Sequence, residues 1–187
     1  MSSKKHLLLC LCLCASLCLS AISYASDFSI LQANTHLVGH MYTLNAEIQY
    51  QLSDESIKAL HNGITLTLVL SVKVYKPRWY LWDRAILNNQ QRYTIQYNLL
   101  TQQYHLMNLN TEIDDHFETL STLLNNLGQI KNLPLLDQKF INDDKKYRVE
   151  LYAKLDIESL PPSLRPLAYM SSDWRLNSGY YLCQLEK

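Results

Sequence analysis

The sequence predicts a mainly β fold: a β-sandwich-like arrangement of mostly antiparallel strands with one or two short packed helices. Several stretches alternate apolar and polar residues, which is the period of half-buried strands. Only two stretches show helical spacing, and they do not alternate with the strands as a parallel α/β sheet would require. An α+β sheet covered by a helix is the alternative.

The chain opens with the three parts of a secretory signal in their usual order. Residues 1–6 form a short basic stretch, and residues 7–19 form an apolar run without a charge. Small residues then stand at Ser23 and Ala25, the positions that a signal peptidase must fit. We expect cleavage between Ala25 and Ser26, which leaves one β-rich domain over residues 26–187, located in the periplasm.

An uncleaved leader would give a different attachment but the same compartment. Residues 7–25 are uncharged and long enough to span a bilayer, for which roughly 17–25 residues suffice. Lys4 and Lys5 would then hold the N-terminus in the cytoplasm and place the domain on the periplasmic side of the inner membrane.

Charge and cysteine content narrow the classes of partner. Loss of Lys4 and Lys5 leaves 15 basic against 17 acidic residues, so a nucleic-acid partner is not expected. Four of the five cysteines belong to the leader, and Cys183 alone remains. The domain therefore has no internal disulfide, and Cys183 is either a buried thiol on the last strand or a thiol that links a partner.

Seven strands follow from the alternation. Four stretches alternate clearly: Tyr42–Leu52, Ile64–Val74, Tyr93–Leu99 and Tyr147–Leu155. Three further stretches are weaker candidates: Phe28–Ala33, Tyr104–Leu109 and Trp174–Cys183. They are separated mostly by turns or short segments, as in an antiparallel sandwich.

Two helices interrupt the strands. The first covers Asp54–His61, with Ser53 as N-cap, an acidic first turn and Gly63 at its end. The second covers Asp115–Leu127, with leucines at helical spacing and Gly128 as the C′ glycine. The proline-rich stretch 160–166 is expected to be a stiff connector without hydrogen bonds of its own.

No residue pattern points to catalysis, a metal or a cofactor, so we expect a protein that is not an enzyme. The G-x-S-x-G elbow of serine hydrolases is absent. Asp114-Asp115 and Asp54-Glu55 stand at the starts of predicted helices, where carboxylates favour the dipole. The histidines look like isolated surface or turn residues: His36, His40, His61, His105 and His116.

The best candidate for a binding surface is the segment around Arg78, Trp79 and Trp82, at the end of a predicted strand. Residues 73–84 combine two of the three tryptophans with several basic side chains. Tryptophan and arginine dominate binding hot spots, and aromatic and basic residues also gather where proteins contact membranes. The simpler interpretation is that both tryptophans cap the core.

Three segments carry a family resemblance: LHNGITL at 60–66, WYLWD at 79–83 and YNLLTQQY at 97–104. They resemble the uncharacterised proteobacterial family DUF4390, and the likeness continues through 117–120, 155–161 and 172–178. The resemblance implies an exported single-domain protein with no assigned activity, cofactor or catalytic residue. It also implies a gene often found beside a membrane histidine kinase of the nitrogen-regulation type.

Together these observations lead us to expect a periplasmic, non-enzymatic interaction module with an envelope or membrane protein as its partner. The role that we expect is that of an accessory to a membrane histidine kinase. Peripheral contact with the membrane itself is compatible with the aromatic and basic segment. The alternative function is a periplasmic protein that binds a small ligand or lipid between its apolar strand faces and a helix.

Overall fold

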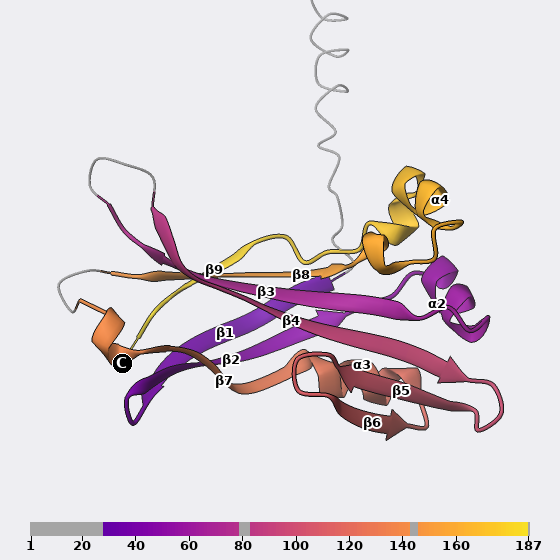
Figure 1. Cartoon of the computed structure of the whole chain (residues 1–187), viewed down its shortest axis with the longest axis horizontal. Coiled ribbons are helices and arrows are strands. Elements are labelled where there is room, and N and C mark those ends of the chain that lie inside the picture. The colour runs from indigo at the N-terminus through magenta and orange to yellow at the C-terminus, as the bar shows by residue number, and fades with distance from the viewer. Residues whose placement is uncertain (1–27, 79–82, 143–145, 187) are drawn as a thin grey trace, which may run out of the picture.

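Two antiparallel sheets form the molecule, as the computed structural model shows for residues 28–78, 83–142 and 146–186 (Figure 1). The three-stranded sheet has the order β1-β2-β7, and the six-stranded sheet has the order β6-β5-β4-β3-β8-β9. Every strand pair in both sheets is antiparallel. The predicted β-sandwich-like class is confirmed.

The strands and helices have the following bounds. The three-stranded sheet consists of β1 (Phe28–Val38), β2 (Met41–Tyr50) and β7 (Gln129–Asp137). The six-stranded sheet consists of β3 (Leu66–Lys76), β4 (Arg84–Asn98), β5 (Gln103–Asn108), β6 (Ile113–Phe117), β8 (Arg148–Leu155) and β9 (Tyr181–Gln184). The α-helices are α2 (Asp54–His61), α3 (Leu120–Gly128) and α4 (Arg165–Met170), and the 3-10 turns are η1 (Gln138–Phe140), η2 (Ile157–Ser159) and η3 (Ser172–Trp174).

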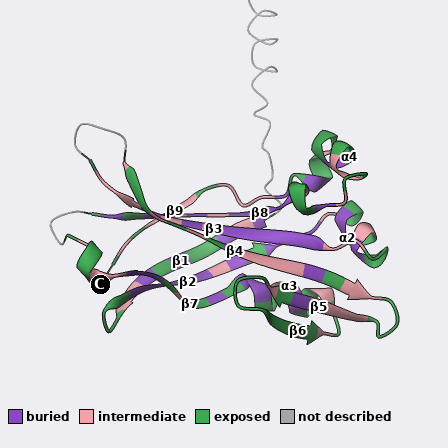
Figure 2. Ribbon diagram, in the orientation of Figure 1, coloured by how far each residue is buried: buried purple, intermediate pink, exposed green. Residues whose placement is uncertain are grey.

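One apolar core lies between the sheets, and the alternating residues of the strands supply it. Strands β2 and β3 carry the longest runs of buried side chains, and every second residue of β8 from Val149 to Leu155 is buried (Figure 2). Val72, Val74 and Leu151 of the six-stranded sheet are 0% exposed, and so is Leu44 of the three-stranded sheet, which belongs to the same core. Each such side chain contributes about 1.5–3 kcal/mol when fully buried, which explains why this period fixes the register.

The first predicted helix is confirmed at both of its ends. The Ser53 hydroxyl accepts the backbone N–H of Ser56 at 3.2 Å, as an N-cap should. Leu60 is 0% exposed, so the helix buries its apolar face. Gly63 adopts a φ of 83° directly after the C-cap, where a residue with a Cβ would be strained.

The second predicted helix was wrong at its start. Asp114 and Asp115 lie on strand β6, and α3 begins only after Thr119, whose hydroxyl accepts the Thr122 N–H at 3.2 Å. Hairpin pairing with β5 satisfies the backbone groups of residues 113–117, and this outweighs a weak helical pattern. The prediction for Gly128 was also wrong, because this residue is the last one of α3 rather than a C′ glycine in the left-handed region.

Other differences concern short or polar elements. Trp174 lies in η3 rather than in a strand. Of the predicted last strand, residues 181–183 lie on β9 and pair with β8, and Asn177 forms an isolated bridge with Lys154. Strand β7 was not predicted, because it contains Pro134 and a proline argues against a central strand. The structure places β7 at the edge of its sheet, where a proline is tolerated. The connector 160–166 is not free of hydrogen bonds, since Leu164 N–H donates to the Pro161 carbonyl at 2.9 Å and α4 begins at Arg165.

The two sheets are joined directly along one side. The Thr35 hydroxyl on β1 donates to the Gln184 carbonyl at 3.1 Å and accepts the Glu186 N–H at 2.7 Å. Helix α3 packs against β2, where Gly128 lies beside Ile48. Within the described ranges, no helix has the length and apolarity needed to cross a bilayer.

Candidate functional site

The paired ends of β3 and β4 at Lys76 and Arg84 lie at one end of the long six-stranded sheet and flank the β3–β4 connection that the sequence singled out (Figure 1). Arg78 is exposed there, and its backbone N–H donates to the Asp83 carboxylate at 3.3 Å. Trp79 and Trp82 fall outside the described residues. The prediction of a binding surface at this place therefore depends on the residues on either side of the connection.

A groove of about 550 Å³ lies beside this connection. It is larger than three other hollows on the described surface, which measure about 190–300 Å³. The lining residues come from the two ends of the β3–β4 connection and from β8 and β9: Pro77, Asp83, Lys146, Arg148, Leu182, Cys183 and Gln184. Strand pairing places Arg148 opposite Gln184, so both strands present side chains to the groove.

Positive charge predominates around the groove. Arg148 forms an ion pair with Asp83, which is the one acidic residue among the described residues of the lining. Lys146 is exposed in the lining, and Arg78 and Arg84 are exposed at the two ends of the connection. Since these three cations have no acidic partner in the lining, the groove favours an anionic ligand or an acidic segment of a partner.

Apolar and aromatic side chains continue along the same strands. Leu182 is 57% exposed on β9, and Tyr180, two residues earlier, is 69% exposed. The Tyr180 ring stacks on Tyr152 of β8, with ring centroids 4.8 Å apart. A basic rim beside exposed apolar groups is the composition of a protein-binding surface, where aromatic residues and arginine are enriched.

Cys183 lies on the last strand, as expected, but it is half-buried rather than buried. Burial raises the pKa of its thiol to about 11, and the Glu186 carboxylate adds to this shift. A thiol with so high a pKa is largely protonated at neutral pH and is a weak nucleophile.

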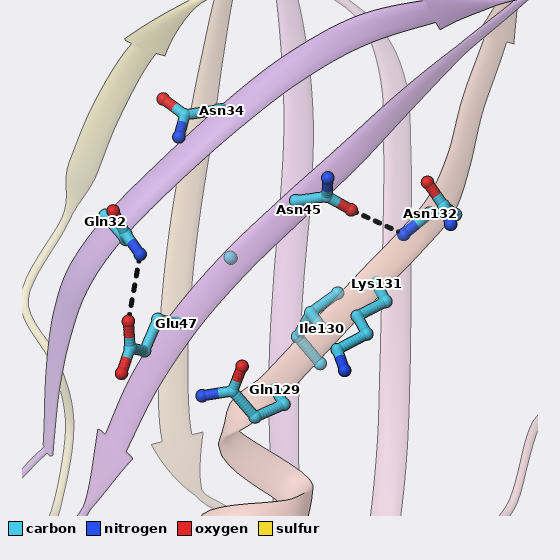
Figure 3. Close-up of a pocket in the computed structure, with 9 residues that line it drawn as sticks. Gln32, Asn34, Asn45, Glu47, Gln129, Ile130, Lys131 and Asn132 are labelled. Atoms are coloured by element: carbon cyan, nitrogen blue, oxygen red, sulfur yellow. Dashed lines mark hydrogen bonds between the residues drawn. The ribbon is translucent and has the colours of Figure 1, made fainter.

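A second hollow, of about 300 Å³, lies on the three-stranded sheet and is lined mainly by amide side chains (Figure 3). Asn132 has a φ of 51°, and its N–H donates to the Asn45 side chain at 2.7 Å. Gln32 donates to Glu47 at 2.9 Å. These polar groups satisfy one another at the irregular pairing of β1, β2 and β7, so the hollow has a structural explanation.

A third place brings together residues that the sequence analysis treated as isolated. His105 on β5 lies directly opposite His116 on β6, with ring centroids 4.1 Å apart. Asp114 lies between them: its carboxylate oxygens are 3.9 Å from Nδ1 of His105 and 3.9 Å from Nδ1 of His116. One potential ligand atom from each of the three residues lies within 4.8 Å of the others.

The sequence contained a signal for this cluster that depends on the correct strands. Residues 105 and 116 stand at equal distances from the turn of the β5–β6 hairpin, so antiparallel pairing makes them neighbours. The sequence analysis extended a helix over Asp115 to Phe117, and this error separated the two histidines.

Comparisons with known proteins give one match. A family model described as "Domain of unknown function (DUF4390)" matches residues 25–184. No curated protein and no solved structure matches the chain.

Proposed function

The chain belongs to the DUF4390 family, and from this premise we propose that it is an exported, non-enzymatic interaction module of the cell envelope. It binds an acidic segment of a partner protein in the groove beside the β3–β4 connection. The observation that carries this proposal is the excess of positive charge around an open groove of about 550 Å³.

The composition of the groove supports binding of a partner rather than catalysis. Lys146 attracts carboxylates, while Leu182 offers an apolar contact in the same lining. Cys183 is the one thiol among the described residues of the lining, and its raised pKa disfavours the nucleophilic thiolate. A groove with charged rim and apolar floor gives specificity through charge and affinity through the buried apolar area.

The first partner to test is the extracytoplasmic part of a membrane histidine kinase. The reason is the gene neighbourhood that the family resemblance implies. A periplasmic domain, whether released by cleavage after Ala25 or held by an uncleaved leader, would reach such a partner from the same side of the inner membrane.

Charge reversal at the groove tests the proposal. A chain that begins at Ser26 would be immobilised and used to bind the kinase's extracytoplasmic domain and, in parallel, detergent-solubilised envelope proteins. The double variant Lys146→Glu and Arg84→Glu replaces two attractions by two repulsions. At about 0.5 kcal/mol each, this amounts to about 2 kcal/mol, or a roughly thirtyfold weaker affinity.

A matched control is available elsewhere on the chain. Lys58 on α2 and Lys131 on β7 are away from the groove lining, and Lys131 is exposed. The variant Lys58→Glu and Lys131→Glu changes the net charge by the same amount and should bind as the parent does. Equal loss of binding in both variants would show a general effect of charge and would contradict a specific groove.

The alternative of a small ligand or lipid predicts a different result. The groove volume lies in the range of about 300–1,000 Å³ typical of small-molecule pockets. Native mass spectrometry of the gently purified chain would then show a bound mass that disappears in the Lys146→Glu and Arg84→Glu variant. Binding to vesicles of anionic lipid without any protein partner would instead indicate peripheral membrane contact.

A further inference from the structure

We propose that His105, Asp114 and His116 form a binding site for a divalent transition-metal ion of the zinc class. The site lies on the β5–β6 hairpin, at the outer edge of the six-stranded sheet (Figure 1). It is formed by residues other than those of the groove, so the two proposals stand independently.

Strand pairing holds the three side chains on one face. His105 and His116 are direct cross-strand partners, and directly opposite residues of an antiparallel pair point to the same face. Asp114 precedes His116 by two residues and therefore shares that face. The backbone hydrogen bonds of the hairpin thus bring all three residues to one place before any ligand binds.

The distances suit an ion better than direct contact. Each Nδ1 is 3.9 Å from a carboxylate oxygen, which is beyond the range of a hydrogen bond. Zinc bonds of about 2.0–2.1 Å in a tetrahedron place two ligand atoms roughly 3.3 Å apart. Closing the site requires the largest separation between ligand atoms, up to 4.8 Å, to shorten to this value. The side chains of His116 and Asp114 are 51% and 37% exposed, so rotation is open to them.

The imidazole ring of His105 is not held by a hydrogen bond to Asp114. Among the described residues, its Nε2 is the one buried side-chain nitrogen or oxygen without a hydrogen-bond partner. Its Nδ1 is 3.9 Å from the Asp114 carboxylate, which is beyond hydrogen-bond range. One ring nitrogen of a neutral histidine carries a lone pair, so this ring can offer that lone pair to an ion without breaking either contact.

The ligand types select the class of metal. Two imidazole nitrogens and one carboxylate oxygen suit Zn²⁺ and related transition metals, whereas Ca²⁺ and Mg²⁺ require more oxygen ligands. Three protein ligands leave a fourth position for water or for a carboxylate of another molecule. The ion would connect β5 to the edge strand β6 and hold the hairpin in register.

Calorimetric titration with zinc tests the site directly. The chain should begin at Ser26, because the leader contains cysteines that would supply thiolate ligands of their own: Cys10, Cys12, Cys14 and Cys18. It should carry no polyhistidine tag, because the tag would also bind zinc. All described elements lie within this shortened chain. The expected result is one Zn²⁺ per chain, with no saturable binding of Mg²⁺ under the same conditions.

Single variants identify the ligands. His105→Asn, Asp114→Asn and His116→Asn should each weaken zinc binding at least tenfold, since even the loss of a group that only orients a ligand costs about 10–100-fold. His40→Asn removes an exposed histidine from the β1–β2 turn and should leave the affinity unchanged. Thermal unfolding of each variant without zinc shows that the fold is retained, and His116→Asn is the mildest because this side chain is half exposed.

Two results would overturn the proposal. One is the absence of saturable zinc binding to the parent chain. The other is binding that survives the double variant His105→Asn and His116→Asn. Neither result would affect the groove, whose test measures binding of a protein partner.

Discussion

Replacing Gly128 by alanine should destabilise the fold, because the backbone of α3 touches the backbone of β2 at this residue. A Cβ at position 128 would lie 2.1 Å from the Ile48 carbonyl oxygen and 3.3 Å from its carbon. The first distance is more than 1 Å shorter than an ordinary van der Waals contact. Ile48 cannot withdraw alone, since it is paired with Ile30 inside the three-stranded sheet.

The size of the effect follows from two opposed contributions. Overpacking in a core costs about 1–3 kcal/mol and sometimes more, and a clash with backbone belongs to the upper part of this range. Alanine recovers up to about 1 kcal/mol through its higher helix propensity. We expect a net loss of about 2–3 kcal/mol in the free energy of unfolding, and for a chain of this length a melting temperature lower by roughly 5–10 °C.

Thermal and urea unfolding followed by circular dichroism measure this loss. Gly39→Ala is the matched control, since a Cβ at Gly39 meets nothing within 4 Å but the φ of 62° is unfavourable for alanine. Its cost should be about 1–2 kcal/mol, from backbone strain alone. A Gly128→Ala chain that melts within 2 °C of the parent would refute the close packing of α3 on β2.

Three further predictions concern the joint between the sheets, one acidic residue and the thiol. Thr35→Val removes the hydroxyl that joins the sheets, so the free energy of unfolding should fall by about 1–2 kcal/mol. The backbone amide of Glu186 should then exchange with solvent faster than in the parent, and an unchanged exchange rate would contradict this joint. Burial alone would raise the pKa of Asp156, but hydrogen bonds from a serine hydroxyl and from Arg92 outweigh it and hold that pKa below its usual range. The stabilisation by Asp156 is therefore complete above about pH 4 and is lost as the pH falls toward the folded-state pKa of this residue. Asp156→Asn should lower the melting temperature at pH 7 and should make the melting temperature depend less on pH below about pH 4. With its pKa raised to about 11, Cys183 should react with iodoacetamide at pH 8 on the order of 100-fold more slowly in the folded chain than in urea, and equal rates would show that the thiol is not protected.

The parts of the fold that could be predicted are those where burial imposes a period on the sequence. Strand β3 buries an apolar side chain at every second position from Leu66 to Val74, which gives a clear period in the sequence, and Thr67 and Val69 between them are buried as well. The two ends of α2 could also be predicted. Ser53 accepts a backbone N–H of the first turn, and Gly63 adopts the positive φ that follows the helix. Both signals are local, and neither needs knowledge of a partner strand.

The parts that could not be predicted depend on distant segments. No residue from 84 to 90 of β4 is buried, so this half of the strand carries no apolar alternation. Gly128 looks like a cap in the sequence, and only the position of Ile48 shows that its small size serves close packing. The two sheet neighbours of His105 became known only with the register of β5, which explains why the metal cluster was missed.

The candidate groove was only partly visible in the sequence. The basic and aromatic side chains of residues 73–84 point to the end of the sheet beside which the groove lies. Lys146, Arg148 and Leu182 complete the groove from strands more than 60 residues later, and pairing of β3 with β8 and of β8 with β9 brings them there. No local pattern in the sequence indicates that these later residues line the groove.

Photo-crosslinking in the intact envelope tests the proposed role most directly. A photoreactive amino acid at Leu182, in the groove, would be compared with one at Leu99, which is 64% exposed in the turn at the opposite end of the long sheet (Figure 1). We predict a discrete adduct with one envelope protein from position 182 and none from position 99. No adduct from position 182, or the same adduct from both positions, would contradict a partner that binds in this groove.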